Sequence, residues 1–357
     1  MRIFPRLSLR YEANRLLLYV LVSFGATVVL TRAYLQVTGY PQVGHGNLHI
    51  AHLLWGGLAM AIAGIVLLIF ATPRVYGISA MLVGIGIGLF IDEVGKFITI
   101  DNNYFFRPAA PIIYVCFLAV ALIYFAVAHR QKSEERLMIA ALERAQALVE
   151  GPMSDQAHAE LQLWLAQLSH AHSPGWTQLA AALEEFAAAQ QVHNTWLSRF
   201  EVRMRRLQLG LQVFFETHMG LITTLIIGIV SLRALSGVII LISTIAVNVL
   251  PDSDIIGFFR PGNGIGIWLQ AVTSALMLVG LVLYFAHRRR AGLFWLQTAM
   301  VLALTVVGVV AFYANQFAAT INMLTDLFVW LVLHTYTNRL LMAEVRIRTV
   351  DAHATHA

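Results

Sequence analysis

Eight long apolar runs divide this sequence, and each has a length that suits a bilayer rather than water. A helix needs roughly 20 mostly apolar residues to cross about 30 Å of hydrocarbon. Composition agrees, because 12% of the residues are charged, whereas soluble domains carry about 25%. We therefore predict an all-α polytopic membrane protein with eight transmembrane helices, near residues 16–36, 48–71, 75–99, 109–128, 218–250, 264–286, 291–314 and 316–338.

The same composition excludes several other classes of protein. Such long apolar runs are not typical of a soluble dinucleotide-binding enzyme, a disordered chain or a secreted mini-protein. Cys116 is the one cysteine, so a disulfide framework within the chain is excluded. The net charge of +5 reflects membrane orientation rather than nucleic-acid binding, and we expect no nucleic-acid partner.

The positions of the basic residues predict how the helices are oriented. Residues 211–250 are long enough for one crossing or two. One crossing, bending near residues 231–237, places most of the arginines on a common side, whereas two crossings would leave residues 288–290 on the opposite one. The positive-inside rule makes the arginine-rich side the cytoplasm. We therefore expect one crossing here, cytoplasmic N- and C-termini and a bacterial-type cytoplasmic (inner) membrane.

Residues 130–212 are the substantial polar segment between the crossings. Helix stops at Gly151-Pro152 and Ser173-Pro174-Gly175 separate pieces with apolar residues at helical spacing. We predict a small cytoplasmic helical domain between a first membrane half, residues 1–129, and a second half, residues 213–340, with a cytoplasmic tail at 341–357. Its apolar stripes either simply pack on each other or form a dimerisation or regulatory module, through which the chain would form homo-oligomers.

Two predicted outer loops suggest an internal duplication. Both contain Phe-Phe-Arg-Pro, at residues 105–108 and 258–261, and both follow an outward helix and precede an inward one. A competing alignment sets the start of the second crossing against that of the sixth, which would make the halves parallel four-helix repeats. Duplication is frequent in transporters but occurs elsewhere too, so a 4+4 repeat stays an open alternative.

Three histidines at the start of the second crossing form a candidate metal shell. His45, His49 and His52 are spaced so that one helix face can carry all three imidazoles. Imidazole suits zinc, iron and copper, and a carboxylate such as Asp92 commonly completes the shell. The alternative is that His45 lies in a loop and that His49 and His52 are capping or interfacial residues.

The third crossing carries charges that need an explanation. Gly84, Gly88, Asp92 and Lys96 lie on one face at four-residue spacing, so that a neighbouring helix can approach closely. Ionisable residues inside a crossing are costly and indicate function unless they are paired. Asp92 and Lys96 can pair with each other at i, i+4, which leaves Glu93 unexplained and makes it the strongest single indication of a site.

These two groups are predicted to meet in the outer part of the membrane. The second and third crossings are joined by a short turn, so they are antiparallel neighbours. Asp101, Asn102 and Arg107 follow in the next loop and would lie over the mouth of the site, as ligands of a hard cation or as an ordinary polar turn. In the second half, Asp326 is a further candidate, with Arg233 as its suggested partner.

Three classes of function fit these residues. The leading hypothesis is a metal-dependent, membrane-embedded enzyme acting on a lipid or a membrane-soluble small molecule, with Glu93 and Asp92 as acid and base and with Lys96 or Arg107 facing an anionic head group. The second is a proton- or cation-coupled transporter that uses Asp92, Glu93 and Asp326. The third is a sensor or scaffold that signals through the cytoplasmic helices.

Overall fold

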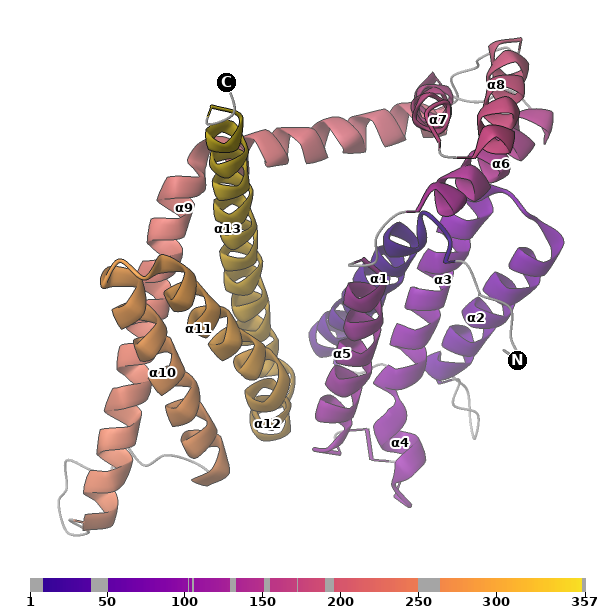
Figure 1. Ribbon diagram of the computed structural model, residues 1–357. Coiled ribbons are helices and arrows are strands. Elements are labelled where there is room, and N and C mark those ends of the chain that lie inside the picture. The colour runs from indigo at the N-terminus through magenta and orange to yellow at the C-terminus, as the bar shows by residue number, and fades with distance from the viewer. Residues whose placement is uncertain are drawn as a thin grey trace, which may run out of the picture. The chain divides into compact units, whose positions relative to one another are not determined.

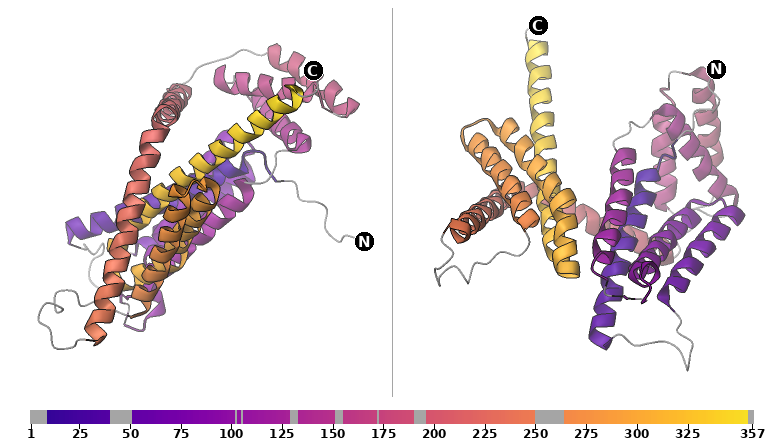
Figure 2. Two further views of the ribbon diagram at one scale, coloured as in Figure 1. Left: turned by 60° about the vertical axis from the view of Figure 1, so that its left-hand side comes forward. Right: turned by 90° about the horizontal axis from the view of Figure 1, so that it is seen from below.

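The computed structural model is helical in the parts of the chain that it describes, and no strand occurs in them. The described residues are 9–39, 51–101, 103–104, 106–128, 133–150, 155–171, 173–189, 196–249 and 264–354. They fall into two compact units, Met1–Gln208 and Leu209–Ala357, whose helices are labelled in Figure 1 and drawn from two further sides in Figure 2. The all-α class predicted from the sequence is confirmed.

In the described part of the chain, seven helical stretches are long and apolar enough to cross a membrane, which makes the chain a multi-pass membrane protein. The predicted first, fourth, fifth and sixth crossings each coincide with one stretch, and the predicted seventh and eighth both fall within the last one. The stretches are Ala13–Thr38, His52–Ile69, Val75–Asp92, Ala109–Ala128, Thr217–Ala246, Ile265–Phe285 and Arg289–Thr337.

In the first unit, helix α3 (Pro73–Asp92) packs between α1 (Ala13–Thr38) and α2 (His52–Ile69), while α5 (Ala109–Ala128) packs on α1 (Figure 1). Pro73 at the first helical position starts α3, since its fixed φ suits a helix and its missing N–H is not needed there. Most side chains on the outer faces of these helices are exposed and apolar, which suits contact with lipid.

Glycines allow α3 to approach both neighbours closely. Gly84 and Gly88 lie against α1, where a Cβ on Gly88 would meet Thr27 at 2.9 Å. Gly86 faces the other way, and its Cβ would meet the carbonyl oxygen of Gly56 on α2 at 2.7 Å. The predicted role of Gly84 and Gly88 in close helix packing is therefore confirmed, and α1 is the neighbour.

The expected helix at 75–99 is interrupted, which corrects one prediction. Helix α3 ends at Asp92, Glu93 has φ −92° and ψ 7°, and a short helix α4 (Val94–Ile98) follows. Gly95 of α4 packs closely against the following loop, where a Cβ would lie 2.9 Å from the carbonyl oxygen of Asn103. Because of the interruption at Glu93, Lys96 leaves the Gly84–Gly88–Asp92 face.

Helices α6 (Glu134–Glu150), α7 (Asp155–Leu168) and α8 (Pro174–Ala188) form a small bundle within the first unit. Its core contains Leu161, Leu165 and Leu168 of α7, together with Leu137 and Met138 of α6. Tyr11, which precedes α1, packs against this core. The bundle is therefore attached to the start of α1 rather than separate from the first membrane helices.

The second unit contains α9 (Trp196–Val249), which begins in the first unit, α10 (Gly264–Phe285), α11 (Arg289–Leu302), α12 (Gly308–Asn315) and α13 (Ala319–Ala354). Helix α9 is continuous through residues 231–237, and its apolar part counts as one candidate crossing. Buried side chains of α9, α10, α11 and α13 form the core, among them Val230, Leu281, Leu296 and Leu333.

The last apolar stretch contains a reversal of the chain. A π-helical turn at Ala303–Val307 joins α11 to α12, and Gln316 then adopts φ 49°. After this turn α13 runs back along α11 and α12 (Figure 1). Positive φ is uncommon for residues other than glycine, and here it allows two apolar helices to fold against each other with a very short connection.

Candidate functional site

Asp92 is the centre of a buried polar cluster at the end of α3. Its side chain is completely buried, and three side chains contact its carboxylate. Arg32 Nε donates to Oδ1 at 2.6 Å, Tyr104 OH donates to Oδ2 at 2.8 Å, and His52 Nε2 lies 3.1 Å from the same Oδ2. Arg32 Nη2 also donates to the Asp92 carbonyl oxygen at 2.9 Å. Both oxygens of this buried carboxylate are therefore hydrogen-bonded.

Glu93 is also completely buried, and its partners explain why it is there. Lys96 Nζ donates to Oε1 at 2.6 Å, and the backbone N–H of Leu53 donates to Oε2 at 2.9 Å. Leu53 lies in the first turn of α2, where free N–H groups and the helix dipole favour a negative charge. Glu93 thus joins the end of α3 to the beginning of α2.

The possible pairing of Asp92 with Lys96 is not formed, because Lys96 pairs with Glu93 at i, i+3. The helix is interrupted at Glu93, and the Lys96 N–H donates to the Glu93 carbonyl oxygen at i, i+3, so the regular i, i+4 geometry between Asp92 and Lys96 is absent. Asp92 instead pairs with Arg32 of α1, 60 residues earlier in the chain.

His52 lies between the two carboxylates. Its Nε2 is 3.1 Å from Asp92 Oδ2, and its Nδ1 is 3.6 Å from Glu93 Oε1. The imidazole is 23% exposed, whereas both carboxylates are fully buried. It is therefore placed between the surface and both buried acids.

Tyr104 covers the cluster from the loop that follows α4. The Arg32 guanidinium lies 4.1 Å from the centre of the Tyr104 ring, and Lys96 Nζ lies 5.3 Å from it. Cations within about 6 Å of an aromatic face are attracted to it. Tyr104 therefore contacts both cations as well as Asp92. We call Arg32, His52, Asp92, Glu93, Lys96 and Tyr104 the acid–base cluster.

Arg32 is the residue that the sequence prediction missed. It lies inside the first predicted crossing, and an arginine inside a crossing is itself an indication of function. The position of Arg32 inside a crossing could therefore have marked it as a candidate, but it could not have identified Asp92 as its partner.

Some of the other predicted site residues are exposed, and some are outside the described part of the chain. Asp101 and Arg107 are exposed. His45, His49 and Asn102 are outside the described residues, so the predicted histidine stripe is represented by His52 alone.

A search of the described residues finds no group of three or more His, Cys, Asp or Glu side chains arranged to hold a metal ion. The four carboxylate oxygens of Asp92 and Glu93 already have partners. A cation binding there would have to displace Arg32 or Lys96 or compete with the other donors. The metal shell as predicted also needs His45 and His49, which are not described.

Asp326 occupies a second polar position, in the second unit. It is 5% exposed on α13 and forms an ion pair with Arg233 of α9. The suggested contact between these two residues is present.

The chain was also compared with known proteins. No protein family, curated protein or solved structure matches it.

Proposed function

We propose that the chain is a proton-coupled membrane transporter in which the acid–base cluster binds and releases the proton. The proposal depends above all on the position of His52 between the carboxylates of Asp92 and Glu93. Histidine is the side chain whose charge ordinarily changes between pH 5 and 8. A proton added to His52 would give each ring nitrogen a hydrogen directed toward a carboxylate.

The charges of the cluster support this assignment. Two buried carboxylates are matched by Arg32 and Lys96, so the cluster is neutral overall while His52 is neutral. Uptake of one proton adds one positive charge beside two acids, and no carboxylate needs to lose its partner. Such a site can load and unload a proton with small movements of side chains.

We further propose that the chain crosses the membrane eight times, with its termini in the cytoplasm of a bacterial-type cell. The reversal at Gln316 supports this count, because it divides the stretch Arg289–Thr337 into two passes. With one pass for α9, the arginine-rich segments then share one side, as the positive-inside rule requires. Asp326 in the second unit is a further buried carboxylate, paired with Arg233.

The test is proton flux into vesicles that contain the purified protein. A pH-sensitive dye trapped inside reports acidification after a pH gradient is imposed, with valinomycin and potassium to cancel the membrane potential. We expect flux that His52→Gln and Asp92→Asn abolish. Asp101→Asn is the matched control, since it removes an exposed carboxylate from the neighbouring loop. Flux that persists in both cluster variants would refute the proposal.

A metal-dependent enzyme is a second candidate, favoured by one observation. His52 already lies near two carboxylates, and His45 and His49 precede it in the sequence. Here the cluster would rearrange around zinc, iron or copper, and Glu93 would act as acid or base on a lipid. Elemental analysis of protein purified without chelators tests this. Close to one metal ion per chain, lost in the His49→Ala/His52→Ala variant, would favour the enzyme over the transporter.

A further inference from the structure

The helices that form the acid–base cluster are also held at their other ends. Helix α1 carries Arg32 and α3 carries Asp92. At the start of α1, Arg10 and Glu12 contact α6, and Tyr76 near the start of α3 lies against Arg10. At 1.5 Å per residue, about 30 Å of α1 and about 24 Å of α3 separate these contacts from the cluster.

The contacts with α6 are polar and partly buried. Arg136, only 9% exposed, donates from Nε to the Leu9 carbonyl oxygen at 2.9 Å and from Nη2 to that of Arg10 at 3.1 Å. Arg144 Nη2 donates to Glu12 at 3.3 Å and to Glu160 of α7 at 3.0 Å. These bonds fix the backbone that enters α1.

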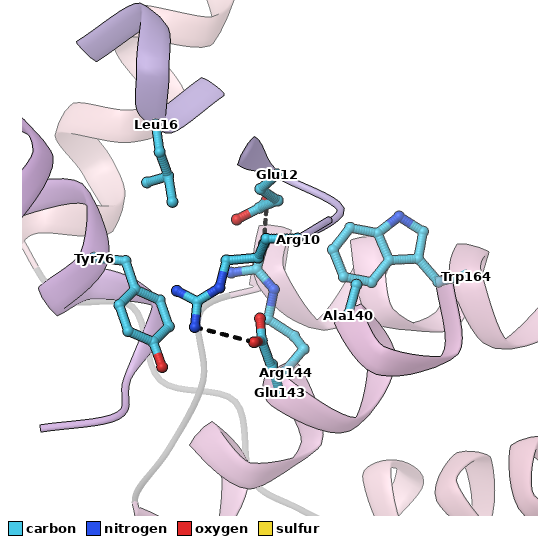
Figure 3. A pocket seen from close by; sticks show the side chains of 8 residues that line it. All are labelled: Arg10, Glu12, Leu16, Tyr76, Ala140, Glu143, Arg144 and Trp164. Carbon is cyan, nitrogen blue, oxygen red and sulfur yellow. Dashed lines mark hydrogen bonds and ion pairs between the residues drawn. The ribbon is translucent and has the colours of Figure 1, made fainter. Parts of the chain in front are cut away.

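Arg10 links three elements. Its Nη2 lies 3.2 Å from Glu143 Oε1 on α6, and its guanidinium lies 3.6 Å from the centre of the Tyr76 ring on α3. Figure 3 shows the Arg10 guanidinium between the Tyr76 ring and the Glu143 carboxylate. We call Arg10, Glu12, Arg136, Glu143 and Arg144 the docking network.

We propose that the α6–α8 bundle, through the docking network, sets the position of α1 along α3 and thereby controls the Arg32–Asp92 ion pair. The connection is mechanical. Gly84 and Gly88 lie against the backbone of α1, so the two helices interlock between the network and the cluster. A displacement at the start of α1 is transmitted along the helix as a shift between discrete packed positions against α3, because closely packed helices do not deform continuously.

The proposed control acts on the Arg32–Asp92 ion pair and does not depend on what the cluster transfers. Its interpretation as regulation of transport rests on the proposed function. A ligand or partner that shifts α6–α8 would change how firmly Arg32 holds Asp92. The polar bundle is thereby assigned a regulatory role that the membrane helices alone do not provide.

The test uses dicyclohexylcarbodiimide, an apolar reagent that modifies carboxyl groups in membranes. Mass spectrometry of peptides gives the rate of modification at Asp92, with Asp326 in the other unit as an internal reference. In vesicles containing the full chain, Arg10→Gln and Glu143→Gln should each raise the rate at Asp92 by at least about fivefold, the lower part of the usual range for coupled sites. Arg136→Lys should raise it as well, because one ammonium cannot replace both guanidinium bonds.

Matched controls separate coupling from loss of the fold. The charge-swapped Arg10→Glu/Glu143→Arg variant should return the rate toward that of the wild type. Glu184→Gln should leave it unchanged, since Glu184 is an exposed carboxylate of α8 that is not part of the docking network. Circular dichroism and size-exclusion chromatography would identify unfolded variants, and the charge swap tests the proposal even if a single variant unfolds.

Arg32→Gln distinguishes failure of this inference from failure of the proposed function. It should raise the rate at Asp92 directly, because it removes the paired cation. If Arg32→Gln raises the rate while every docking variant matches the wild type, the mechanical control is refuted and the proton site remains. If Arg32→Gln has no effect, Arg32 does not hold Asp92 and this inference is refuted as well, whereas the proposed function is decided separately by the flux assay.

Discussion

Removal of the Arg32 guanidinium should destabilise the first unit strongly. Asp92 is completely buried, and Arg32 contributes both a 2.6 Å contact to its carboxylate and a 2.9 Å bond to its carbonyl oxygen. Removing one partner of a buried ion pair costs about 3–5 kcal/mol. Tyr104 and His52 still contact the carboxylate. The loss of unfolding free energy in Arg32→Gln should therefore lie at the lower end of this range, about 3 kcal/mol, which corresponds to roughly a 150-fold increase in the unfolding equilibrium constant.

A double variant tests whether an unpaired charge causes the loss. In Arg32→Gln/Asp92→Asn the carboxylate is neutral as well, so no charge remains buried without its partner. This variant should be more stable than Arg32→Gln alone, although it carries an additional substitution. Arg107→Gln, which removes an exposed arginine from the loop before α5, should leave stability unchanged.

The measurement is reversible denaturation in mixed micelles, followed by circular dichroism. The reasoning would be refuted if the losses of the two single variants simply added in the double variant. Additive losses are the rule for residues that do not interact, so that result would mean that Arg32 and Asp92 do not depend on each other.

Three further predictions concern packing and hydrogen bonds. Gly56→Ala places a Cβ 2.7 Å from two backbone atoms of α3 and should lower the free energy of unfolding by about 1–3 kcal/mol. Gly57→Ala, whose Cβ would have nothing within 4 Å, should be neutral or slightly stabilising, and thermal unfolding compares the two variants. Tyr104→Phe keeps the ring but removes a 2.8 Å bond to a buried carboxylate, so denaturation should show a loss of about 1.5–3 kcal/mol. Asp326→Ala should unfold more readily than Arg233→Met/Asp326→Leu, because the single variant leaves a cation without its partner; equal stabilities would contradict this.

Much of the architecture could be predicted from the sequence alone. The length of an apolar run determines whether a helix can cross a bilayer, because every backbone polar group must be satisfied within the helix there. For that reason 109–128 matches α5, and 264–286 nearly matches α10. Asp92 and Glu93 were predicted as site residues because charged groups are costly in an apolar medium, whereas His52 was predicted as a metal ligand from the helical spacing of three histidines.

The partners of these residues were decided by the tertiary structure. Helical periodicity gives the face on which Asp92 lies but not which helix covers that face, and apolar faces toward lipid and toward protein look alike in sequence. Glycines in α3 bring α1 close enough for Arg32 to reach Asp92 across 60 residues of chain. The break at Glu93 then directs Lys96 to Glu93, and Glu93 in turn holds the start of α2 and places His52 between both acids. Such contacts depend on the positions of three helices at once, which no local pattern specifies.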